Sequence, residues 1–123
     1  MSYLLLSVTH IIGVLFLFTA LGATLMHVLN GGTKENNPWK KQLSIIHGVS
    51  LLVILLAGLG ILISWGVKPS AFEGWVWAKI VIWAFFGAAI VLPYKVPKSA
   101  KLLMFLLPLI GGISVYLAVY KPF

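Results

Sequence analysis

The chain has 123 residues, of which 61% are hydrophobic and only 9% are charged. A soluble domain carries about a quarter charged residues, so the composition excludes a soluble fold and predicts that lipid covers the apolar surface. The net charge of +7 comes from lysine, and the absence of cysteine excludes disulfides, iron–sulfur clusters and thiolate metal sites.

Four apolar segments follow one another along the chain, each close to the roughly 20 residues that a membrane-spanning helix needs. We expect them at about 3–29, 38–65, 72–92 and 99–120. The first ends at Asn30-Gly31-Gly32, a helix stop and turn. The residues Met1-Ser2-Tyr3 include no basic side chain, and the apolar run after them exceeds the core of a signal peptide, so we expect no cleaved signal. The last segment contains Pro108, where we expect a kink. The sequence therefore predicts an all-α integral membrane four-helix bundle, a single transmembrane domain over residues 1–123.

The lysines predict the orientation of this bundle. The loops after the first and third segments share one side of the membrane and carry most of the lysines: Lys34, Lys40, Lys41, Lys95, Lys98 and Lys101. The other side carries Lys68 and Lys121. The positive-inside rule places the lysine-rich loops in the cytoplasm and both termini outside, in a multi-pass protein of the bacterial inner membrane. We expect these lysines to contact anionic membrane lipids and no nucleic acid, because no basic segment alternates with exposed aromatic residues.

Four ionisable side chains fall inside the apolar segments, where such groups are costly and therefore candidates for function. They are His10, His27, His47 and Lys79. At about 1.5 Å of rise per residue, His10 and Lys79 lie at a similar depth near the outer side, and His27 and His47 lie nearer the cytoplasmic side. His47 shares a helix stripe with Gly58, whereas His27 points about 100° away from His10 and is not expected to share its ligand.

Haem b is the cofactor that best fits isolated histidines in an apolar bundle, because imidazole is a common haem ligand and haem lies between the helices of such bundles. No acidic residue accompanies the histidines, which disfavours a zinc, iron or calcium site and a nucleophile–base pair. Each residue also has a purely structural interpretation. His27 could be an ordinary interfacial residue, His10 and His47 could hydrogen-bond across helices, and Lys79 could snorkel to the headgroups. The many glycines fit close helix packing as well as a flat ligand.

Three stretches resemble the HemJ-type protoporphyrinogen oxidases. Residues 6–14 carry a histidine in an H-x-x-G setting, like the first helix of that family, and residues 74–79 (GWVWAK) resemble its G-W-x-x-x-K stretch. Residues 115–121 look like its short C-terminal tail. The resemblance implies haem b as the cofactor, with His10 and Lys79 as the functional pair. SirB-like and copper-resistance-D-like membrane proteins share a looser version of the pattern, and this chain lacks the arginine that the HemJ-type family has near the end of its first helix.

We therefore expect a membrane haem b-binding protein with His10 and His47 as candidate metal ligands. Lys79 and His10 are the candidate catalytic residues, and His27 completes the cofactor-binding set. Two uses remain open. One is oxidation of a porphyrinogen, with Lys79 steering a propionate or helping proton removal. The other is electron transfer to a redox partner protein through a haem held by two histidines. The alternative is a cofactor-free accessory subunit of a larger membrane complex. As an assembly we expect a homo-oligomer or a subunit of such a complex.

Overall fold

The structure, a computed structural model, describes residues 2–123, so Met1 and the expectation that rests on it lie outside the described residues. Over that range the chain is helical and contains no strand. The elements in chain order are α1 (Tyr3–Leu29), α2 (Lys40–Ser64), the 3₁₀ turn η1 (Pro69–Ala71), α3 (Gly74–Ala88), the one-turn helix α4 (Leu92–Lys95) and α5 (Ser99–Tyr120).

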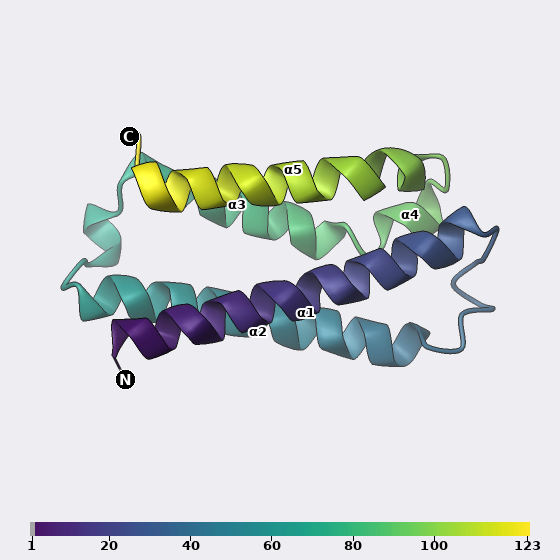
Figure 1. Cartoon of the computed structure of the whole chain (residues 1–123), viewed down its shortest axis with the longest axis horizontal. Helices are drawn as coiled ribbons and strands as arrows, with labels where there is room; N and C mark the ends of the chain where they lie inside the picture. The colour runs from purple at the N-terminus through teal and green to yellow at the C-terminus, as the bar shows by residue number, and fades with distance from the viewer. Residues whose placement is uncertain (1) are drawn as a thin grey trace.

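The helices form two packed pairs. α1 and α2 lie side by side as an antiparallel hairpin with the most extensive contact in the molecule, and α3 and α5 form the second pair (Figure 1). The pairs meet chiefly where α5 contacts α1 and where α3 contacts α2. Both chain ends lie at one end of the bundle, and the loop after α1 lies with α4 at the other (Figure 1). There the Asn37 side-chain amide donates to the Tyr94 hydroxyl at 2.8 Å, so the two lysine-rich loops meet at one end, as the sequence predicts.

Three helices, α1, α2 and α5, are long and apolar enough to cross a membrane. α3 is also apolar but has only 15 residues. At about 1.5 Å per residue it spans roughly 22 Å, less than a hydrocarbon core of about 30 Å. Large apolar side chains cover the outside of the bundle, and on α5 Phe105, Leu109 and Val119 are each about two-thirds exposed. Such a surface is typical of a protein that lies in lipid.

The third predicted helix differs most from its expected range of 72–92. α3 ends at Ala88, and the chain passes through a turn before α4 begins with Pro93 in its first turn. Proline has no backbone N–H and its ring clashes with the carbonyl four residues earlier, so a helix that approaches Pro93 must break near Ala89. α2 begins two residues later than expected, because the Asn37 side chain accepts from the Trp39 N–H at 3.0 Å and holds this stretch in a turn.

The bundle is tightly packed toward the end with the lysine-rich loops. The larger buried cluster draws its side chains from α1, the end of α3 and the first half of α5: Leu17, Leu21, Leu25, Val28, Phe86, Ala89, Ala100, Leu103 and Leu107. Near the other end α1 and α2 approach closely at Gly13. A Cβ there would lie 3.0 Å from Ile54 Cγ1 and 3.2 Å from Val53 Cγ1. This close contact brings the first half of α1 against the second half of α2.

Candidate functional site

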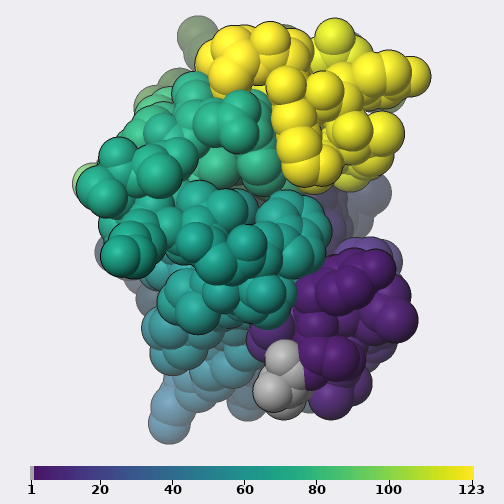
Figure 2. Space-filling model, turned by 90° about the vertical axis from the view of Figure 1, so that its left-hand side faces the viewer, coloured from purple at the N-terminus to yellow at the C-terminus, as the bar shows by residue number. Residues whose placement is uncertain are grey.

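A cavity of about 610 Å³ opens between the helices in the half of the bundle that holds the two termini. Its walls come from the first half of α1, the second half of α2, most of α3 and the second half of α5. Figure 2 looks onto this end and shows a hollow between the purple start of α1, the teal middle of the chain and the yellow end of α5. Phe18 and Phe86 separate the cavity from the packed half of the bundle. Their rings pack edge to face, with 5.3 Å between the ring centroids. The cavity is thus a mostly apolar chamber closed at its inner end.

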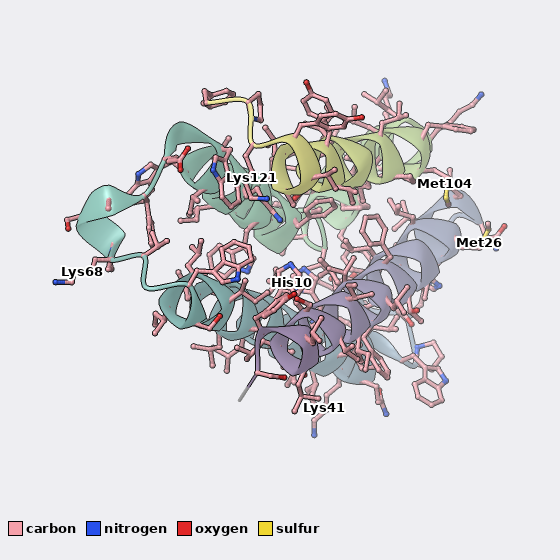
Figure 3. The ribbon with its side chains drawn as sticks, turned by 60° about the vertical axis from the view of Figure 1, so that its left-hand side comes forward. His10, Met26, Lys41, Lys68, Met104 and Lys121 are labelled. Carbon is pink, nitrogen blue, oxygen red and sulfur yellow. The ribbon has the colours of Figure 1, made fainter. Side chains whose placement is uncertain are left out.

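His10 is the one histidine that lines this cavity. Its Nδ1 lies 2.9 Å from the Ile54 carbonyl oxygen of α2. A carbonyl can only accept, so Nδ1 carries the hydrogen and Nε2 of the neutral ring carries the lone pair. Within the described residues Nε2 makes no hydrogen bond. It is also not fully enclosed by protein atoms, so it is open to the cavity. Figure 3 shows the His10 ring on the inner side of α1, facing the space between the helices.

Gly58 makes the room that His10 occupies. A Cβ at this position would lie 3.4 Å from Cε1 and 3.5 Å from Nδ1 of the ring, which is ordinary van der Waals contact, so the ring packs directly beside the Gly58 backbone. Gly58 itself lines the cavity. Gly58, which the helix periodicity placed on one stripe with His47, therefore packs against His10 of the neighbouring helix α1.

Lys79 lines the same cavity from α3. Its side chain and that of His10 belong to the walls of one cavity, Lys79 from α3 and His10 from α1. The estimate from helix depth placed His10 and Lys79 at one level, and the fold brings them to one chamber. Lys79 is partly buried.

His47 lies outside the cavity, buried in the packed half of the molecule with only 5% of its surface exposed. Its Nε2 donates to the Phe86 carbonyl oxygen at 2.9 Å. Phe86 is in the last turn of α3, where its carbonyl has only the bond from the C-cap Ala89 N–H at 3.3 Å besides the one from His47. His47 therefore fastens the end of α3 to α2, and the nitrogen that could coordinate a metal on that side of the ring is already hydrogen-bonded.

His27 holds the loop that joins α1 to α2. Its Nε2 lies 2.9 Å from the Thr33 carbonyl oxygen and 2.8 Å from Asn36 Oδ1, and both oxygens can accept from an N–H. The Asn36 side chain in turn accepts from the Thr33 N–H at 2.7 Å. The ring covers Gly32, where a Cβ would collide with it. The structure thus separates the four candidates: His10 and Lys79 share the cavity, and His47 and His27 do not reach it.

Three residues of this region received no functional role from the sequence. Trp83 lines the cavity and ties α3 to α2, because its Nε1 donates to the Leu51 carbonyl oxygen at 3.0 Å. Trp75 also lines the cavity, and its buried Nε1 has no hydrogen-bond partner. Lys121 reaches the rim of the cavity from the end of α5. The sequence assigned the tryptophans no role and used Lys121 only as a marker of orientation, since no spacing rule places residues so distant in sequence together.

Within residues 2–123 no group of three or more histidine, cysteine, aspartate or glutamate side chains is placed to hold a metal ion. A metal held in the cavity would therefore take a single protein ligand from the histidines, as an iron carried by a macrocycle does. Comparisons of the chain with protein-family models, with curated proteins and with solved structures gave no match.

Proposed function

We propose that this chain is a four-helix membrane protein, similar to the HemJ-type proteins, that binds haem b through His10 and oxidises a porphyrinogen. The observation that carries the proposal is the hydrogen bond from His10 Nδ1 to the Ile54 carbonyl at the wall of an apolar cavity. A ligating histidine is commonly held in this way, because the bond fixes the tautomer and aims the other nitrogen at the metal.

The residues of the cavity fit haem b. A volume of about 610 Å³ lies within the roughly 300–1,000 Å³ that is usual for small-molecule and cofactor pockets. The walls are aliphatic and aromatic, which suits a flat apolar macrocycle, and Gly58 and Gly111 both line them. Lys79 supplies a cation for a propionate, and charge-assisted hydrogen bonds to carboxylates are among the stronger ones.

A single histidine in the cavity favours porphyrinogen oxidation over electron transfer. A low-spin haem needs two axial ligands, and His47 and His27 do not line the cavity. Bound haem would supply one-electron redox chemistry. The chain itself would hold the iron with His10, hold an acidic group of the haem or the porphyrinogen with Lys79, and exclude water with its apolar walls.

The proposed setting is the bacterial inner membrane, with α1, α2 and α5 as full spans and α3 with α4 as a fourth, interrupted one. Six of the nine lysines lie on the loop after α1, at the start of α2, on α4 and around the start of α5, which the positive-inside rule assigns to the cytoplasm. The cavity then opens toward the outer side, where both termini lie.

The absorbance spectrum of purified protein reconstituted with haem tests this proposal. Wild-type protein should show a Soret band with a high-spin ferric spectrum, and His10→Ala should lose or shift it because alanine cannot replace the coordinate bond. His27→Ala is the matched control and should keep the wild-type spectrum, since His27 lies at the loop. An unchanged Soret band in His10→Ala would refute the assignment of the ligand, and absence of any band in wild-type protein would favour a cofactor-free accessory subunit.

Lys79→Met tests the second member of the pair. Methionine keeps the apolar stem and removes the charge, so insertion and helix content should be preserved. Haem retention or oxidase activity should fall, because a buried carboxylate left without its partner costs roughly 1–3 kcal/mol. Wild-type haem content together with wild-type activity in Lys79→Met would show that Lys79 only snorkels.

A further inference from the structure

We infer that Lys79 and Lys121 form a carboxylate-binding subsite at the rim of the cavity. The subsite takes the acidic groups of a flat, apolar, membrane-soluble ligand whose body fills the chamber. The inference rests on the proposed function for the identity of that ligand. It adds Lys121, held in place by the C-terminal residues, as a second cation beside Lys79.

The C-terminal residues are anchored onto the start of α3. The Trp75 backbone N–H donates to the Phe123 carbonyl oxygen at 2.9 Å, which satisfies an unpaired donor at the N-terminus of α3. The Phe123 ring packs on Gly74, where a Cβ would collide with it. Glu73, at the N-cap of α3, makes no side-chain capping bond there. The residues after α5 thus replace the usual cap of α3.

Lys121 adopts a left-handed backbone conformation to make this connection. It has φ 47°, and no other residue than glycine has a positive φ in the described part of the chain. Such a conformation is unfavourable for a residue with a side chain and persists where surrounding contacts impose it. The strained turn at Lys121 and the two anchors beyond it fix where the lysine side chain can go.

The Lys121 ammonium consequently lies at the edge of the cavity. It is 5.7 Å from the centroid of the Trp65 ring and 5.5 Å from that of the Trp75 ring, and both tryptophans line the chamber. One of its three N–H groups donates to the Ala118 carbonyl oxygen at 2.8 Å, which leaves two donors for another partner. Figure 3 shows Lys121 across the space between the helices from His10.

The rim therefore gathers two cations. Lys79 follows Trp75 by one turn of α3, and the Lys121 ammonium lies over the Trp75 ring, so both lysines lie beside the same part of the cavity wall. A carboxylate is an acceptor-only anion that would take hydrogen bonds from both ammonium groups and offset their like charge. Two lysines at one rim match a ligand with two carboxylates on the same edge, as haem and porphyrinogens have.

The test compares iron protoporphyrin with its dimethyl ester, which has the same body and no charge. Titration into wild-type protein in a neutral detergent, followed by the Soret band, should give about tenfold or greater preference for the diacid, the gain expected of one charge-assisted contact. Lys121→Met should lose most of this preference, and Lys121→Arg should keep it. Lys68→Met is the matched control, because Lys68 is an exposed loop lysine at the same end of the bundle.

A second variant displaces the tail while both lysines stay in place. In Gly74→Ala the new methyl group occupies the position of the Phe123 ring, so the diacid preference should fall as it does in Lys121→Met. Gly22→Ala is the control for a helix glycine, since its Cβ meets nothing within 4 Å, and it should bind like wild-type protein.

The possible outcomes distinguish failure of the carboxylate subsite from failure of haem binding. Equal affinity of wild-type protein for diacid and diester would overturn the subsite and leave haem binding intact, and so would an undiminished preference in both Lys121→Met and Gly74→Ala. Binding of neither compound would overturn the proposed function and the subsite with it. Displacement of the diacid by phosphatidylglycerol but not by phosphatidylcholine would reassign the rim to a lipid phosphate and overturn the carboxylate assignment.

Discussion

At the scale of single residues, the three histidines differ in the oxygen that each one meets. His10 bonds to a carbonyl in the middle of α2, His47 to a carbonyl at the end of α3, and His27 to oxygens of the loop after α1. Helix periodicity gives the depth and direction of a side chain but not its partner on another helix. The sequence could therefore predict that His10 and Lys79 lie at one level. It could not separate His47 from the cofactor set.

His47→Ala should destabilise the protein without removing haem. The substitution removes a buried imidazole and the bond across the helices, and leaves the Phe86 carbonyl with only the longer bond from the Ala89 N–H at 3.3 Å, which costs roughly 1–3 kcal/mol. The thermal unfolding midpoint in detergent should fall, while the Soret band per mole of folded protein stays at the wild-type value. Loss of the band at an unchanged midpoint would instead return His47 to the set of ligands.

Lys121 and Trp75 mark the limit of what the sequence could predict of the site. Their placement depends on a left-handed turn at a lysine and on Phe123 packing over Gly74. Neither feature has a sequence pattern, since left-handed turns are usually formed by glycine or asparagine. Gly74 offered the one available clue, but it reads equally as part of the G-W-x-x-x-K stretch.

At the scale of helices, length and apolar composition predicted α1 and α5 to the residue and α2 to within two residues, as expected for long apolar segments with clear stop signals at their ends. The break between α3 and α4 was not predicted. Pro93 was visible as a terminator, but the helix ends several residues before it, because the clash of the proline ring acts one turn upstream. This break leaves a helix end at Ala88, and the His47 side chain bonds to the Phe86 carbonyl in its last turn.

The close approach of α1 and α2 gives a prediction at this scale. Gly13→Ala places a methyl group 3.0 Å from Ile54 Cγ1 and 3.2 Å from Val53 Cγ1, so side chains beside the cavity must shift. Overpacking of this kind typically costs about 1–3 kcal/mol. Thermal unfolding in detergent should show a lower midpoint for Gly13→Ala.

Gly22→Ala is the comparison within the same helix, because its Cβ meets no atom within 4 Å. Alanine favours a helix over glycine by up to about 1 kcal/mol, so its midpoint should be equal to or above that of wild-type protein. Equal midpoints for the two variants would mean that the helix contact at Gly13 is looser than the structure has it.

At the scale of the whole molecule, the distribution of charge predicts the orientation in the membrane. Cysteine is absent from the sequence, so single cysteines can be introduced at Ser2, just before α1, and at Asn36, in the loop after α1, which lie at opposite ends of that helix. A membrane-impermeant maleimide added to intact cells should label Ser2→Cys and leave Asn36→Cys unlabelled until the membrane is opened. The reverse pattern would place the lysine-rich loops outside.

The division of the bundle into a packed half and a hollow half has a consequence for biogenesis. Protein contacts alone hold the packed half together. They are the larger apolar cluster, the α1–α2 contact at Gly13 and the bond from His47 to α3. The nascent chain can therefore insert and fold first, and we expect the proposed haem to bind afterwards, from the side toward which the chamber opens. Cells starved of the ligand should accumulate a folded, protease-resistant precursor that matures without new protein synthesis, and ligand addition should then raise its unfolding midpoint by mass action.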